Sequence, residues 1–194
     1  MSARSTPSAR TTRLDPRQPF VLDVRELGRR PGSMKPVRAE VRAPAGLTVG
    51  MAGVPEGAPV LLDLRLESVV EGVLVSGTVT APVTGECARC LTPVTDEETV
   101  EVTELFAYPD SVTDQTSEED EVSHLVGDML DLEPVVRDAL VLDLPLSPLC
   151  RDDCRGLCAG CGIALDDLPD DHTHTSTDPR WAALAERFGG TDKE

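Results

Sequence analysis

The sequence predicts a β-rich α+β domain that contains an antiparallel meander, a few short helices and a zinc-ribbon-like cysteine site. Three observations support this class. Apolar residues alternate between about positions 60 and 106, helix-start signals occur near Asp131 and Asp178, and six cysteines fall into two clusters. A chain of 194 residues can bury one sizeable core. We therefore expect three parts: a disordered tail at 1–19, a single domain at 20–175, and an amphipathic helix with a tail at 176–194.

The predicted strands follow the period of two that a strand shows when one of its faces is buried. Leu62, Leu64 and Leu66 alternate with charged residues, and similar runs occupy 73–79 and 100–106. The connections between these runs are short, which predicts that successive strands pair antiparallel as a meander. The first cysteine pair falls at the turn between the second and third strands of this set.

The other segments carry weaker or opposing signals. Residues 20–27 suit a short strand or a turn of helix, whereas Gly and Pro between 28 and 38 break regular structure. Residues 108–121 are polar and acidic, which predicts an exposed loop. A helix is expected to begin near Asp131, with Pro134 in its first turn. A second helix is expected after Asp178-Pro179, with an apolar stripe made by Trp181, Leu184, Ala185 and Phe188.

The negative charge of the chain is concentrated in one stretch. The formal net charge is −17, and residues 96–143 hold sixteen acidic residues against one basic residue, Arg137. Such a field repels phosphates and attracts basic partners. The segment 25–42 is basic, and it can face either the acidic stretch or a nucleic acid. Aromatic residues are too scarce for a platform that stacks single-stranded RNA.

The cysteines are spaced as metal ligands. Cys87-Ala-Arg-Cys90 and Cys158-Ala-Gly-Cys161 are C-x2-C pairs, and together they can complete a tetrahedral Zn²⁺ site. An alternative set replaces the second pair with Cys150 and Cys154, whose C-x3-C spacing is less typical of a knuckle. A two-metal cluster would need further ligands. Among the candidates, His172 and His174 are interpreted as part of a solvated loop.

The remaining patterns do not indicate an enzyme. A site with four sulfur ligands leaves no open position for substrate, and the sequence contains no Gly-rich phosphate loop or G-x-S-x-G turn. No stretch of about eighteen apolar residues suggests a membrane span, and residues 1–19 have no apolar segment typical of a secretory signal. We therefore expect a cytoplasmic protein whose thiols stay reduced and available for metal.

Several motifs, in order along the chain, resemble the YceD family, which is named for the accumulation of large-subunit ribosomal RNA. They are Leu27-Gly-Arg-Arg-Pro-Gly-Ser-Met, Cys87-Ala-Arg-Cys90-Leu, Asp131-Leu-Glu-Pro-Val-Val-Arg-Asp-Ala-Leu, Leu144-Pro-Leu, and Cys150 to Gly162 with its Gly-Leu-Cys-Ala-Gly-Cys-Gly ending. The resemblance spans roughly residues 20–188, and the Arg-Pro-Gly-Ser-Met and Asp-Pro-Arg-Trp segments are similar to an actinobacterial-type member. It implies a cytoplasmic, non-enzymatic role in making or stabilising the large ribosomal subunit.

The charge pattern adds a hypothesis about the partner. An acidic protein can promote the accumulation of ribosomal RNA by holding a basic ribosomal protein, or by docking on the pre-ribosomal large subunit, without touching the RNA. Residues 96–143 would form or flank the docking surface. Two alternatives remain open: a direct RNA-binding assembly factor that uses the basic segment 25–42, and a thiol-redox or zinc-handling protein.

Overall fold

The computed structural model describes residues 14–109, 111–116, 122–174, 179–181, 184 and 187. Its main element is a seven-stranded sheet with the path β2-β5-β6-β4-β3, in which β7 pairs with the other side of β6 and β8 pairs parallel to β7. The large strands are β2 (Met34–Arg42), β5 (Pro59–Ser68), β6 (Gly72–Glu86) and β7 (Pro93–Ala107). The small ones are β3 (Thr48–Val49), β4 (Ala52–Gly53) and β8 (Ser123–His124).

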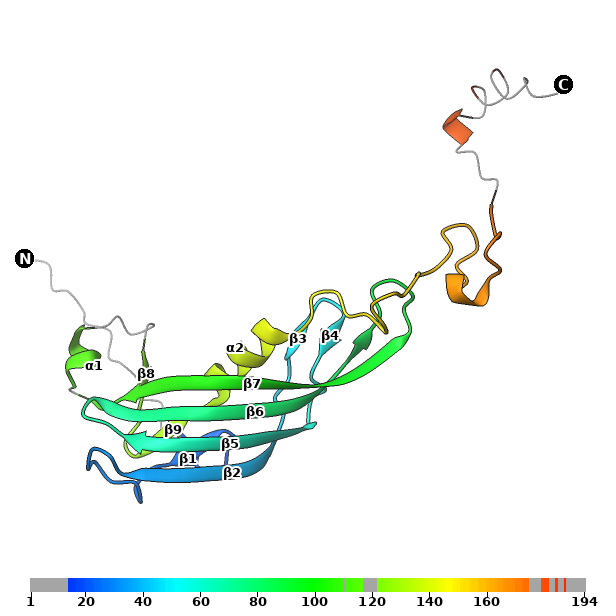
Figure 1. Ribbon diagram of the computed structural model, residues 1–194. Helices are drawn as coiled ribbons and strands as arrows, with labels where there is room; N and C mark the ends of the chain where they lie inside the picture. Colours follow the sequence, from blue (N-terminus) through cyan, green and yellow to red (C-terminus); the bar gives the residue numbers. More distant parts are fainter. Residues whose placement is uncertain are drawn as a thin grey trace, which may run out of the picture.

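A second, smaller layer lies against one face of this sheet (Figure 1). It consists of a two-stranded sheet, β1 (Val21–Asp23) paired antiparallel with β9 (Met129–Asp131), and of the helix α2 (Glu133–Asp143). Leu130, Leu132, Val136 and Leu140 from this layer are 0–1% exposed in the shared core. The predicted α+β class is confirmed.

The meander predicted between residues 60 and 106 is also confirmed. β5, β6 and β7 follow one another antiparallel, with Leu64 opposite Gly77 and Gly77 opposite Val102. The alternating apolar residues of these strands face the smaller layer: Val60, Leu62, Leu64 and Leu66 of β5 are all at most 2% exposed. Their charged neighbours lie on the opposite, solvated face, as the period of two requires.

The expectation that Gly and Pro break regular structure between 28 and 38 is wrong for its second half. β2 begins at Met34 and continues through Pro36, pairing with β5 along nine residues. Proline is tolerated because β2 is an edge strand, so its missing N–H faces no neighbouring strand. Pro82 in β6 has a similar explanation. It lies between the residues that pair with β5, which end at Thr80, and those that pair with β4, which begin at Thr84.

The helices agree with the sequence in part. Asp131 Oδ1 accepts the N–H of Glu133 at 2.9 Å, and Pro134 lies in the first turn of α2, as predicted. The expected loop at 108–121 contains a short helix, α1 (Val112–Thr116). Of the expected C-terminal helix, only a 3-10 turn at Pro179–Trp181 and two single residues belong to the described part. Of the expected tail at 1–19, residues 1–13 lie outside the described part, and residues 14–19 contain a turn in which Gln18 N–H donates to Asp15 O at 3.0 Å. Among the described residues, no helix has the length and apolar character needed to cross a membrane.

Candidate functional site

The first cysteine pair occupies the turn that joins β6 to β7. Cys87 N–H donates to Thr92 O at 2.8 Å, and Leu91 N–H donates to Cys87 O at 2.8 Å. Leu91 takes a positive φ of 61° to close this tight turn. The turn directs both sulfurs to the same side, with Cys87 fully buried and Cys90 partly buried.

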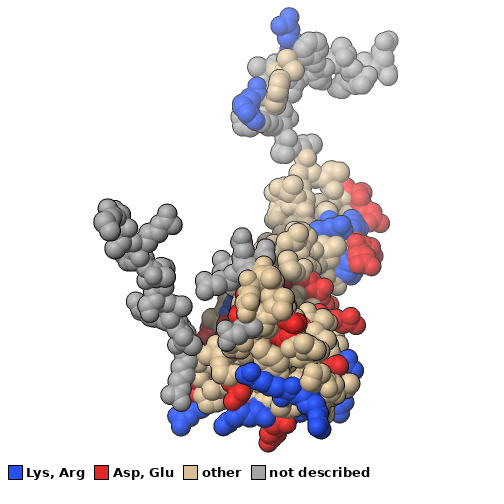
Figure 2. Space-filling model, turned by 90° about the vertical axis from the view of Figure 1, so that its left-hand side faces the viewer, with Lys and Arg blue, Asp and Glu red and all other residues tan. Residues whose placement is uncertain are grey.

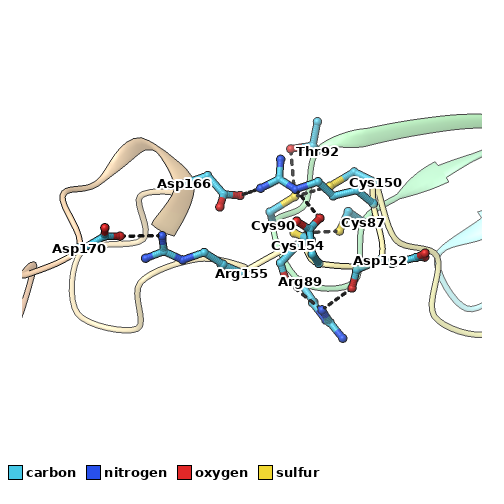
Figure 3. Close-up of polar contacts among 12 residues, drawn as sticks. Cys87, Arg89, Cys90, Thr92, Cys150, Asp152, Cys154, Arg155, Asp166 and Asp170 are labelled. Carbon is cyan, nitrogen blue, oxygen red and sulfur yellow. Dashed lines mark hydrogen bonds and ion pairs between the residues drawn. The ribbon is translucent and has the colours of Figure 1, made fainter.

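The chain after α2 returns to this turn and brings the third and fourth sulfurs. Ala88 N–H donates to Pro148 O at 2.8 Å, and Leu157 N–H donates to Arg89 O at 3.2 Å. The Arg89 guanidinium also joins the turn to the segment after α2, because it donates to the carbonyl oxygens of Asp152 and Cys154 at 3.2 and 2.9 Å (Figure 3). Two segments about sixty residues apart are therefore joined by backbone and side-chain hydrogen bonds around the sulfurs.

Cys87, Cys90, Cys150 and Cys154 form a four-cysteine cluster whose ligand atoms all lie within 4.8 Å of one another. Cys87 Sγ lies 3.8 Å from Cys154 Sγ, and Cys90 Sγ lies 3.6 Å from Cys150 Sγ (Figure 3). A zinc–sulfur bond of about 2.3 Å gives a tetrahedron with sulfur–sulfur edges of about 3.8 Å, whereas a disulfide needs about 2.05 Å. The spacing fits four ligands around one ion.

The protonation behaviour of the cluster also favours a cation. Backbone N–H groups, that of Cys150 foremost, lower the pKa of the Cys87 thiol to about 6. The Thr92 side chain lowers the pKa of Cys90, whereas the Cys90 sulfur together with burial raises the pKa of Cys150 to about 12. Some thiols are thus prepared to ionise, but their neighbours resist further negative charge. A divalent cation at the centre removes this conflict.

The other predicted pair lies in a second group. Cys158 and Cys161 are gathered with His172 and His174, again with all ligand atoms within 4.8 Å of one another. The preferred set of Cys87, Cys90, Cys158 and Cys161 is thus divided between two places, and the alternative pair Cys150 and Cys154 is the one brought to the first turn. Which residues bind metal stays a prediction. The signal for the histidines was present as His-x-His following C-x2-C by eleven residues, but polar neighbours favoured a solvated loop.

An acidic groove of about 290 Å³ adjoins the four-cysteine cluster. Asp96 and Glu98 of β7 line one side, and the segment 145–152, which leads to Cys150, lines the other. Burial raises the pKa of Glu98, and the carboxylates of Asp143 and Asp96 raise it further. Within the described part of the chain, none of these three carboxylates forms an ion pair with Lys or Arg. Asp96 and Glu98 line the groove, and Asp143 lies next to Glu98 outside the lining, so the groove and its margin carry uncompensated negative charge.

The basic segment 25–42 lies along the opposite margin of the molecule, where Lys and Arg gather in Figure 2. Much of its charge is already used. The internal contacts are Arg25 with Asp23, Lys35 with Glu26 at 2.7 Å, Arg38 with Asp63 at 3.2 Å, and Arg29 over the ring of Tyr108 at 4.7 Å. These contacts reduce the positive charge available to an external phosphate.

Comparison with known proteins identifies both similar individual proteins and a matching protein family. The chain is 53% identical over 171 residues to uncharacterized proteins of Mycobacterium tuberculosis and Mycobacterium bovis, covering 88% of this chain and 82% of each relative. It is 48% identical over 168 residues to an uncharacterized protein of Mycobacterium leprae, covering 87% and 77%. No solved structure matches significantly. Residues 75–186, a range that contains both cysteine clusters, match the family described as "Large ribosomal RNA subunit accumulation protein YceD". The chain belongs to this YceD family.

Proposed function

We propose that this protein is a non-enzymatic accessory factor of large ribosomal subunit biogenesis that works in the cytoplasm by binding a basic partner. The family name supports the process, since it refers to accumulation of the large ribosomal RNA. The acidic groove supports the manner of action, and its uncompensated carboxylates are the observation on which the proposal rests. A basic ribosomal protein fits this charge better than RNA does, because phosphates would be repelled.

The raised pKa of Glu98 indicates that the groove favours a positively charged side chain. Crowded carboxylates disfavour one another's charge, so a Lys or Arg side chain entering the groove relieves repulsion in addition to forming its own contacts. The groove also offers apolar surface from Val83, Val94 and Leu149 for the stem of such a side chain. Holding a basic protein in this way would shield it from indiscriminate binding to RNA.

The four-cysteine cluster, on this proposal, holds a structural Zn²⁺. Four sulfur ligands saturate a tetrahedral ion, so the site supplies stability and no open position for substrate. Its place supports a structural role: it ties the β6–β7 turn to the segment that forms one wall of the acidic groove. This arrangement is the reason for proposing a binding protein and not an enzyme.

The experiment is a pull-down from lysate with crosslinking and mass spectrometry, using the full chain. The groove variant combines Asp96→Asn, Glu98→Gln and Asp143→Asn. The control variant combines Glu40→Gln, Glu97→Gln and Glu101→Gln, which removes the same charge from the solvated face of the sheet.

We expect the wild type and the control to retain a basic large-subunit protein that crosslinks near the groove, and the groove variant to lose it. Equal retention by both variants would contradict the proposal. So would recovery of RNA at moderate salt with no ribosomal protein present, because RNA would then be the direct ligand.

Direct RNA binding is the second candidate, and the basic margin in Figure 2 is the observation that favours it. The internal ion pairs of this segment weigh against it. Charge reversal of Arg29 and Arg30 distinguishes the two functions. If RNA is bound through this margin, the doubly reversed variant loses pre-ribosomal particles. If the groove is the binding surface, the particles remain bound.

A further inference from the structure

The segment after the four-cysteine cluster is folded without a hydrophobic core. None of residues 157–174, all of which the structure describes, is buried. The segment nevertheless has a defined course, with an isolated bridge between Leu157 and Ala164 and a 3-10 turn at Leu165–Asp167. Units this small need a metal or a disulfide to remain folded in water. In Figure 1 this segment extends away from the sheet, so the sheet does not cover it.

We propose that Cys158, Cys161, His172 and His174 form a second zinc site, separate from the four-cysteine cluster. The inference concerns only this cysteine–histidine cluster and does not depend on the proposed role in ribosome assembly. Two thiolates and two neutral imidazoles balance the charge of Zn²⁺, and mixed nitrogen and sulfur ligands in a tetrahedron suit this ion. The ion would hold residues 157–174 as a small folded unit.

The distances between ligand atoms agree with this coordination. His172 Nε2 lies 3.5 Å from Cys158 Sγ and 3.5 Å from Cys161 Sγ. Bonds of about 2.3 Å to sulfur and 2.0–2.1 Å to nitrogen give a sulfur–nitrogen edge of about 3.5 Å in a tetrahedron. The two histidine rings are nearly perpendicular, with an angle of 83°, and their Nε2 atoms are 2.8 Å apart. In a tetrahedral zinc site the two nitrogen ligands lie about 3.3 Å apart, so the two Nε2 atoms need to separate by about half an ångström when the ion binds.

The backbone around the cysteines has the form of a metal-binding knuckle. Cys158 N–H donates to Ile163 O, and Gly162 N–H donates to Cys158 O, both at 2.8 Å. Gly162 has a φ of +74°, a conformation that glycine adopts without strain. This hairpin places both thiols on one side.

The histidines approach the hairpin from a loop that is fixed at its base. His172 N–H donates to Pro169 O at 3.0 Å, and Asp170 accepts from Arg155 at 3.2 Å (Figure 3). Arg151 forms a second ion pair, with Asp166, on the same unit. These contacts position the loop independently of the ligands.

Gly160 supplies a separate observation that the site is shaped for His174. A Cβ at Gly160 would lie 2.4 Å from Cδ2 and Cγ of the His174 ring, closer than atoms can approach. The positions of Gly160 and His174 are therefore matched, since any larger residue would force the ring away from the two sulfurs. This gives a variant that disturbs the site while leaving all four ligands in the chain.

The experiment is native mass spectrometry of the full chain, purified under reducing conditions and supplied with Zn²⁺. We expect two ions on the wild type and one on the double variant His172→Ala, His174→Ala, with Thr173→Ala as the matched control that keeps both. Gly160→Ala should weaken binding of one ion at least tenfold and leave the other unchanged. Circular dichroism of the sheet should be unaffected in every variant, which separates metal loss from unfolding.

Cobalt substitution identifies the ligands. Co²⁺ in a site of two sulfurs and two nitrogens absorbs at shorter wavelength than in a site of four sulfurs, and the double-histidine variant should lose only the shorter-wavelength bands. A double-histidine variant that keeps every ion bound by the wild type would overturn the proposal, and so would a Co²⁺-loaded wild type that lacks the shorter-wavelength bands. A chain two hydrogen masses lighter, with Cys158 and Cys161 joined as a disulfide under these conditions, would overturn it as well.

Discussion

Replacing Cys90 by serine tests whether metal binding at the four-cysteine cluster stabilises the domain. Cys90 is only partly buried, and serine has nearly the same shape, so the packing of the core changes little. What is lost is one thiolate 3.6 Å from Cys150 Sγ. Any large loss of stability in Cys90→Ser therefore reports on the metal and not on the hydrophobic core.

The expected magnitude follows from the number of ligands. Structural zinc in small domains contributes about 10–16 kcal/mol of apparent binding free energy, so removing one of four ligands costs on the order of 3 kcal/mol. A change of 1 kcal/mol lowers the melting temperature by about 2–4 °C in a domain of this size, which gives a decrease of about 6–12 °C. Cys161→Ser is the matched control, because it removes a thiolate from the other cluster and should leave the melting of the sheet unchanged.

The assay is thermal unfolding followed by circular dichroism, under reducing conditions, with equimolar Zn²⁺ and again after a strong chelator. With zinc, Cys90→Ser should melt well below the wild type. After chelation the two proteins should melt together, because the interaction that distinguishes them has been removed. A variant with the wild-type melting temperature in zinc would refute the reasoning, and so would a difference that persists after chelation.

Three further predictions concern the sheet and the groove. Glu98→Gln should raise the free energy of unfolding near pH 7 by about 0.5 kcal/mol. The reason is that the pKa of this partly exposed carboxyl is raised in the folded state, so its ionisation at pH 7 destabilises the fold, and Gln removes that penalty. This gain in stability over the wild type should vanish as the pH falls below the ordinary glutamate pKa of 4.5, because Glu98 is then protonated in both states. A gain in stability that does not change with pH would contradict this explanation. Gly77→Ala should cost about 2–4 kcal/mol in urea unfolding, because φ is +147° and a Cβ would lie 2.2 Å from Asp63 O; an unchanged midpoint would disprove this. Phe106→Ala should lower the free energy of unfolding by about 3–5 kcal/mol, because the Phe106 side chain is only 2% exposed. Thr103→Ala on the solvated face should lower it little, and comparable losses for the two variants would show that burial is not the cause.

The strands that the sequence predicts correctly are those whose two faces differ. β5, β6 and β7 bury one face and leave the other half-buried or exposed, so their apolar residues alternate. β2 was missed because its partly buried face is less apolar and because Pro36 reads as a break. Only the position of β2 at the edge of the sheet makes that proline acceptable, and edge position is a tertiary property.

The grouping of the cysteines could not be read from spacing for a similar reason. Both C-x2-C pairs have good knuckle spacing, whereas Cys150 and Cys154 do not. What brings the latter two to Cys87 is the course of the chain after α2, where Ala88 bonds to Pro148. Sequence spacing describes local turns, but the choice between two nearby pairs depends on a contact across about sixty residues.

The position of the four-cysteine cluster connects its structural role with the proposed binding role. The segment 145–154 forms one wall of the acidic groove and ends in two of the four sulfur ligands, so the same residues serve the groove and the cluster. Pro145 and Pro148 stiffen this segment, but few of its residues are buried, and hydrogen bonds to Ala88 and Arg89 are its main other attachment. Loss of the ion would therefore free the wall before it unfolds the sheet. On the proposed function, the metal determines the shape of the surface, while Asp96, Glu98 and Asp143 determine which partner binds to it.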